Sequence, residues 1–148
     1  MKERSPNRAV SCCLLGVIVS LVLVGGVSHT PIRHLIQVTP ACLIAALAWR
    51  GVAWSRVAAL PVFLIWLFLM AFIWLYLLRI VSVISGTFSP MEILLTMTIG
   101  LSALAGIVFL FRWRESARWS SRLFGFLVSS VFQVAALWLS FQPTFAGR

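Results

Sequence analysis

Residues 57–81 have the sequence VAALPVFLIWLFLMAFIWLYLLRIV, and the first 22 of them carry no charge. At about 1.5 Å per residue such a segment forms a helix of about 37 Å, which exceeds the ~30 Å hydrocarbon layer of a bilayer. The stretch therefore predicts a transmembrane helix. Tilt, or extension of the Arg79 side chain to the head groups, would absorb the excess length.

The composition agrees with this prediction, because 61% of the residues are apolar and only 10% are charged. Soluble domains usually contain about 25% charged residues. Four more apolar runs flank the first one. The sequence therefore predicts an all-α integral membrane helix bundle that forms a single domain over residues 1–148, with no soluble domain. The five predicted transmembrane helices are residues 9–27, 31–49, 57–81, 90–111 and 123–141.

Residues 1–8 are basic and precede an apolar run, as in a secretory signal peptide. The apolar run is longer than the usual ~7–15 residues, and no Ala-x-Ala cleavage site follows it. We expect residues 1–8 to form a cytoplasmic basic N-terminus that leads into an uncleaved first helix. Cleavage near Ser28 is the alternative.

The basic residues predict the orientation. If the N-terminus is cytoplasmic, nine of the twelve Lys and Arg residues lie in cytoplasmic segments, which include the basic loop 112–122. The positive-inside rule then favours an N-in/C-out orientation. The short basic loops, with no targeting sequence recognised, lead us to expect a multi-pass protein of the bacterial cytoplasmic (inner) membrane. Anionic head groups at the cytoplasmic face are the expected partners of this charge. Nucleic acid is not expected as a partner, because the basic residues are not gathered on one soluble element.

The carboxylate inventory excludes several kinds of chemistry. The chain contains no Asp, and its three acidic residues are Glu3, Glu92 and Glu115. Paired-carboxylate catalysis and oxygen-ligand metal sites are therefore not expected. The cysteines form no CxxC, and neither histidine has a partner on a facing helix that could complete a haem site. We predict no metal, no cofactor and no enzymatic activity.

Small and polar residues follow one stripe on three of the predicted helices, which indicates packed faces in a membrane bundle. The three stripes are Arg33, Gln37, Ala41, Ala45 and Ala48; Glu92, Thr96, Gly100, Ala103 and Gly106; and Gly125, Ser129, Gln133, Ala136 and Ser140. Gln133 is predicted to form an interhelical hydrogen bond. The third helix is bulky on every side, which suits a wall facing lipid or another protein.

A cluster of polar residues is predicted at the outer-leaflet end of the bundle. Its candidate site residues are Arg33, His34, Gln37, Arg79, Glu92 and Thr96. The same end is predicted to hold His29, Ser85, Thr87 and Ser89. Arg33 and Arg79 could bind an anionic group there, with Glu92 or His34 exchanging protons. The structural alternative is a capping box in which Ser89 is the N-cap, Pro90 the first helical residue and Glu92 the third.

Two hypotheses follow for the function. The first is a non-enzymatic accessory or assembly subunit of a membrane complex, because titratable groups are nearly absent from the middle of the spans. The alternative is a small carrier or binder for a lipid or amphiphilic anion, with its polar site at the outer leaflet. The expected partners are membrane lipids, together with other membrane subunits or further copies of the chain.

Overall fold

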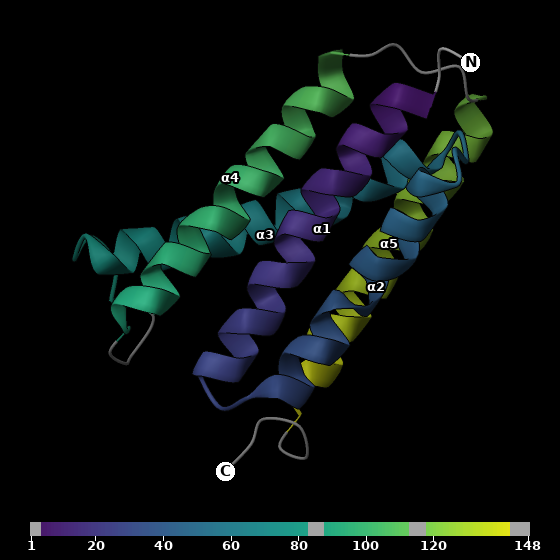
Figure 1. Cartoon of the computed structure of the whole chain (residues 1–148). Helices are drawn as coiled ribbons and strands as arrows, with labels where there is room; N and C mark the ends of the chain where they lie inside the picture. The colour runs from purple at the N-terminus through teal and green to yellow at the C-terminus, as the bar shows by residue number, and fades with distance from the viewer. Residues whose placement is uncertain (1–3, 83–87, 113–117, 143–148) are drawn as a thin grey trace.

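The computed structural model describes residues 4–82, 88–112 and 118–142, and within these ranges the chain is helical with no strands (Figure 1). The helices are α1 (Arg4–Val27), α2 (Pro31–Trp49), α3 (Ser55–Leu77), α4 (Pro90–Arg112) and α5 (Trp119–Ser140). Each of the five is long and apolar enough to cross a membrane. The prediction of five apolar helices is confirmed.

Several predicted boundaries are corrected by local backbone geometry. α1 begins at Arg4, so part of the basic N-terminus belongs to the helix. α5 begins at Trp119 because Arg118 has the extended backbone of an N-cap residue, with φ −60° and ψ 146°. The predicted loop 112–122 is correspondingly shorter, and its residues 113–117 lie outside the described part of the chain.

α3 spans Ser55–Leu77 rather than residues 57–81, because Arg79 has a left-handed backbone with φ 59°. The amide of Ile80 donates to Leu75 O over 3.0 Å, and the amide of Arg79 donates to Tyr76 O over 2.9 Å. This pair of bonds is a Schellman motif, which closes a helix whatever the hydropathy of the residues that follow. The predicted boundary at residue 81 was wrong because Ile80 and Val81 are apolar and continue the hydropathy pattern of the helix.

Figure 1 shows α1, α2, α4 and α5 running along or against one direction, while α3 crosses them. α3 first contacts α5, where Ser129 Oγ donates to Ala58 O over 2.6 Å. Further along, α3 packs on the glycines of α4: a Cβ at Gly106 would overlap the ring of Phe63, and a Cβ at Gly100 would overlap Trp74. The bulky α3 is thus complementary to the small residues of α4.

The burial pattern tests the predicted faces. All five residues of the α5 stripe are buried, and so are Gln37, Ala41, Ala45 and Ala48 of α2. Thr96, Gly100, Ala103 and Gly106 of α4 are buried as well. The prediction of packed small and polar stripes is therefore confirmed. The interpretation of α3 as a wall holds only for part of its surface, because nine of its residues are buried inside the bundle.

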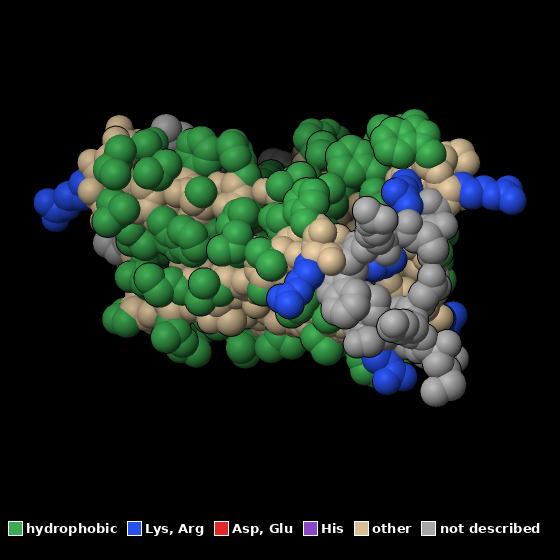
Figure 2. Space-filling view, turned by 90° about the horizontal axis from the view of Figure 1, so that it is seen from above, with side chains coloured by type: hydrophobic (Ala, Val, Ile, Leu, Met, Phe, Trp, Pro, Cys, Tyr) green, Lys and Arg blue, Asp and Glu red, His purple; other side chains and the backbone are tan. Residues whose placement is uncertain are grey.

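The two ends of the bundle differ in character. The first turns of α1, α3 and α5 and the last turns of α2 and α4 meet at one end, which we call the basic end; it carries Arg8, Arg50, Arg56, Arg112 and Arg118. The other end we call the cavity end. In Figure 2 most of the basic side chains in view lie toward one end, and hydrophobic side chains cover the remaining length. A lipid-facing surface has this apolar character.

Candidate functional site

A cavity of about 510 Å³ lies at the cavity end of the bundle, beside the turn that joins α1 to α2. Residues of all five helices line it, and most of them are aliphatic or aromatic. The lining consists of Leu21, Val24, Ser28, Thr30, Arg33, His34, Gln37, Trp66, Leu69, Met70, Phe72, Ile73, Phe88, Glu92, Thr96, Ile99, Leu137 and Phe141. Ligand pockets in proteins commonly have this size and this mixture of an apolar wall with a few polar groups.

Five of the six candidate residues predicted from the sequence line this one cavity: Arg33, His34, Gln37, Glu92 and Thr96. They come from α2 and α4, which are far apart in the chain, make no contact with each other among the described residues and both pack on α1. The sixth residue, Arg79, does not line it. Ser85 and Thr87, which were also predicted at this end, lie outside the described residues.

Arg33 lies in the first turn of α2, where the exposed amides make the helix end electropositive. That turn contains no acidic residue, and the Thr30 side chain does not cap it. The guanidinium is half-buried and stacks over the Phe141 ring, with its central carbon 4.2 Å from the ring centroid. Arg33 forms no ion pair with any described residue, and its Nε has no hydrogen-bond partner there. The cavity wall therefore carries a positive charge that no described side chain neutralises.

His34 is held by the turn between α1 and α2. Its Nδ1 lies 3.1 Å from Thr30 O and 3.3 Å from Thr30 Oγ1, so a protonated Nδ1 would donate to the carbonyl and an unprotonated Nδ1 would accept from the hydroxyl. Thr30 is in turn 2.9 Å from the Ser28 hydroxyl, which donates to Val24 O over 2.7 Å. In the neutral tautomer whose Nδ1 is protonated, Nε2 is the acceptor.

Gln37 and Gln133 join α2 to α5. Gln37 Nε2 donates to Ser140 Oγ over 2.9 Å, and Gln133 Nε2 lies 3.4 Å from Gln37 O, so Gln133 makes a long interhelical hydrogen bond. The other amide atom of Gln133, Oε1, is buried without a partner in the described structure. The side-chain nitrogen of Gln37 thus donates to the α5 contact and is less available to donate to a ligand in the cavity.

Glu92 closes the first turn of α4 through both bonds of a capping box. Its Oε2 accepts from the Ser89 amide at 2.7 Å, and its own amide donates to Ser89 Oγ at 3.2 Å. Pro90 is the first residue of the helix, where its missing amide proton costs nothing. Glu92 is half-buried and is the one carboxylate in the part of the chain that the structure describes. Thr96 donates to Ile93 O of its own helix over 2.8 Å.

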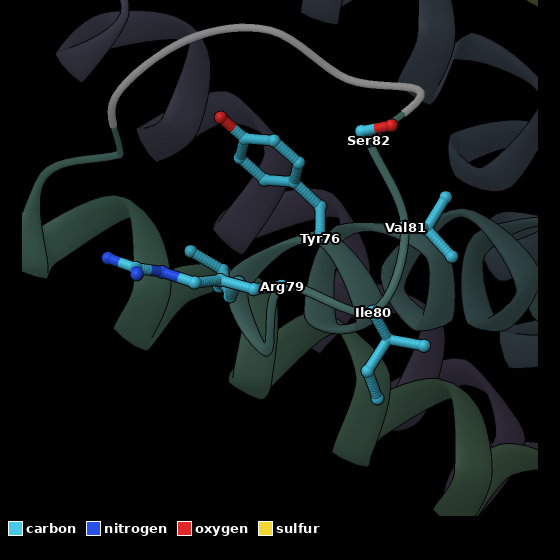
Figure 3. Close-up of a pocket in the computed structure, with 6 residues that line it drawn as sticks. Tyr76, Arg79, Ile80, Val81 and Ser82 are labelled. Carbon is cyan, nitrogen blue, oxygen red and sulfur yellow. The ribbon is translucent and has the colours of Figure 1, made fainter.

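Arg79 follows the end of α3 and lines a separate hollow of about 410 Å³ with Tyr76, Leu77, Ile80, Val81 and Ser82. Figure 3 shows its side chain extending away from Val81 and Ser82. Arg79 is exposed and contributes no charge to the larger cavity. The structure therefore places Arg33 and Arg79 in different hollows, and they do not form the predicted joint site for one anion.

Sequence reasoning missed the apolar wall of the cavity. Trp66, Met70 and Ile73 of α3 line it, and Phe141 covers Arg33 from the end of α5. On a helix that is apolar on every side, no periodicity separates a cavity wall from a lipid-facing surface, so no signal in the sequence marked these residues.

No group of three or more His, Cys, Asp or Glu side chains that could hold a metal ion occurs among the described residues. No protein-family model matches the chain, and neither a curated protein nor a solved structure shows significant similarity to it.

Proposed function

We propose that this chain is a non-enzymatic membrane protein that binds an amphiphilic molecule with an anionic group, with its apolar part in the cavity and its charge on Arg33. The observation that carries the proposal is the half-buried Arg33, which lines an apolar cavity without an ion pair among the described residues. An unpaired guanidinium at the positive end of a helix is electrostatically unfavourable, and a bound anion would relieve this cost.

The lining of the cavity supports an amphiphile rather than a small hydrophilic anion. The aromatic and aliphatic side chains of α3, such as Trp66 and Met70, exclude water from most of the wall. Burial of an alkyl chain there contributes about 25 cal/mol per Å² of apolar surface, while the polar residues lie on α2 and α4. A ligand with one charged end and one apolar end matches both parts.

The binding test compares two arginine variants of the purified full-length chain by native mass spectrometry after gentle solubilisation from membranes. The wild type and Arg79→Met are expected to retain an amphiphile with an anionic group, because Arg79 lies outside the cavity. Arg33→Met is expected to lose at least about tenfold in occupancy, as when a charge-assisted hydrogen bond is removed. Equal retention by Arg33→Met, or an equal loss in Arg79→Met, would contradict the proposal.

We also propose that the protein lies in a bacterial cytoplasmic membrane with the basic end facing the cytoplasm, so that it is N-in/C-out. The support is the distribution of Lys and Arg, nine of twelve of which fall on that side. Single cysteines at positions 29 and 51, in a background without the native cysteines, test the orientation. Position 29 should react with a membrane-impermeant maleimide from outside and position 51 should not; the reverse pattern would overturn it.

The accessory-subunit hypothesis is the second candidate. Among the described residues that are buried, the titratable one is Arg56, and it lies in the first turn of α3 rather than in the middle of the bundle. The bulk of α3 no longer supports this hypothesis, because much of α3 packs inside the bundle. A protein that remains alone and monomeric after mild solubilisation would count against it.

A further inference from the structure

We infer that the cavity selects an amphiphile with a zwitterionic head group, whose anionic part lies on Arg33 and whose ammonium part lies on Glu92. This inference rests on the proposed function and adds the class of ligand. It follows from the charged residues that line the cavity, which are Arg33 and Glu92 without the Arg79 that the sequence also predicted there.

The charge balance of the cavity is the first argument. With Arg33 and Arg79 together the site would be dominated by positive charge, but Arg79 lines a different hollow. The cavity keeps one arginine and one glutamate, and the two form no ion pair with each other. A purely anionic head group would bring negative charge close to Glu92 and be repelled by it. A head group with both signs of charge satisfies both side chains.

The two helix ends at the cavity carry side chains of opposite charge, Arg33 on α2 and Glu92 on α4. α2 begins without a side-chain cap and carries Arg33, so its first turn attracts an anion. α4 begins with its amides capped by Ser89 and Glu92, so its positive end is already compensated. Only Oε2 of Glu92 is used in that cap, and Oε1 makes no hydrogen bond within the described residues. This oxygen can accept a hydrogen bond from an ammonium group.

His34 lines the same cavity and can supply a second acceptor. In the neutral tautomer whose Nδ1 donates to Thr30 O, Nε2 is an acceptor. A primary ammonium group has three N–H donors, so it can use an imidazole nitrogen as well as a carboxylate oxygen. A head group whose donors are hydroxyls could bond to these acceptors, but it would lack the positive charge that strengthens a bond to the Glu92 carboxylate.

The experiment uses the full chain in nanodiscs or mixed micelles, with phosphatidylethanolamine and phosphatidylglycerol as competing probes of equal chain length. Both contain a phosphate, and only the first has an ammonium group. Glu92→Gln is the informative variant, because glutamine at the third helical position still accepts from the Ser89 amide and so preserves the cap. Arg33→Met serves as the control for loss of binding altogether.

The wild type is expected to prefer phosphatidylethanolamine by about tenfold, the effect of one charge-assisted hydrogen bond. Glu92→Gln is expected to lose this preference while still binding phosphatidylglycerol, and thermal unfolding should show that it remains folded. Equal binding of the two lipids by the wild type, or an unchanged ratio in Glu92→Gln, would overturn this inference and leave the proposed function standing. Failure of the wild type to bind either lipid better than Arg33→Met would overturn both.

Discussion

The two halves of the bundle are packed differently. In the half toward the basic end, α3 lies directly on its neighbours: the Ser129 hydroxyl bonds to Ala58 O, and the Phe63 ring occupies the space above Gly106. In the half toward the cavity end, α3 has crossed from α5 to α4, and its residues after Met70 are only partly buried. A cavity of about 510 Å³ remains between the helices there.

The difference teaches that the direction of α3 determines where the bundle is open. α4 and α5 each contact α3 and make no contact with each other in the described residues. Where α3 leaves α5, small residues no longer close the space, and the end of α5 is held by α2 through Gln37 and Ser140. The polar side chains at this end, such as Arg33 and Glu92, therefore line a cavity instead of being buried between helices.

The largest expected effect comes from adding side-chain volume in the tightly packed half, toward the basic end. Gly106→Val places side-chain atoms where the fully buried Phe63 ring lies, so something must shift. Overpacking of this kind costs about 1–3 kcal/mol or more, and we expect a clear decrease in the thermal unfolding temperature in detergent. Gly26→Ala is the control, because its Cβ would meet nothing within 4 Å. If Gly106→Val were as stable as Gly26→Ala, the two halves would not differ in packing.

An intermediate effect is expected at the contact that holds α5 at the cavity end. Gln37→Leu removes the 2.9 Å bond to Ser140 and should cost about 0.6–1.5 kcal/mol, the range for interhelical bonds in membranes. Gln133→Leu removes a long bond and also an unpartnered buried oxygen, so the change should be close to zero. Denaturant titration of both variants measures the difference, and the opposite order would mean that Gln133 is the main clamp.

The smallest effects are expected at the helix ends. His29, Gly51 and Arg79 all have left-handed backbones at the ends of α1, α2 and α3, with φ of 56°, 79° and 59°. Non-glycine residues pay about 1 kcal/mol there, so His29→Gly and Arg79→Gly should stabilise by up to about 1 kcal/mol. Gly51→Ala should destabilise by a similar amount. Thermal unfolding of the three variants checks the signs, and destabilisation by both glycine substitutions would show that the side chains contribute more than the strain.

Most of the fold could be predicted from the sequence, because spans, caps and small-residue stripes are local signals. Ser89 and Glu92 form both bonds expected of a capping box, and Gln133 makes the expected interhelical hydrogen bond, whose partner on α2 was not predicted. The end of α3 could not be predicted, because a left-handed Arg79 among apolar residues leaves no local trace. The separation of Arg79 from Arg33 also depends on the crossing direction of α3, which is set by contacts between residues distant in sequence.

The central claim is that the space at the cavity end binds a ligand, and two threonines on α4 test it most directly. Thr96 lines the cavity, whereas Thr98 is exposed on the same helix. Phosphatidylethanolamine should raise the unfolding temperature of the wild type and of Thr98→Trp, since a ligand that binds the native state stabilises it. Thr96→Trp should stay folded, because the cavity accommodates the ring, and should show no such increase. An equal increase in a folded Thr96→Trp would contradict the account.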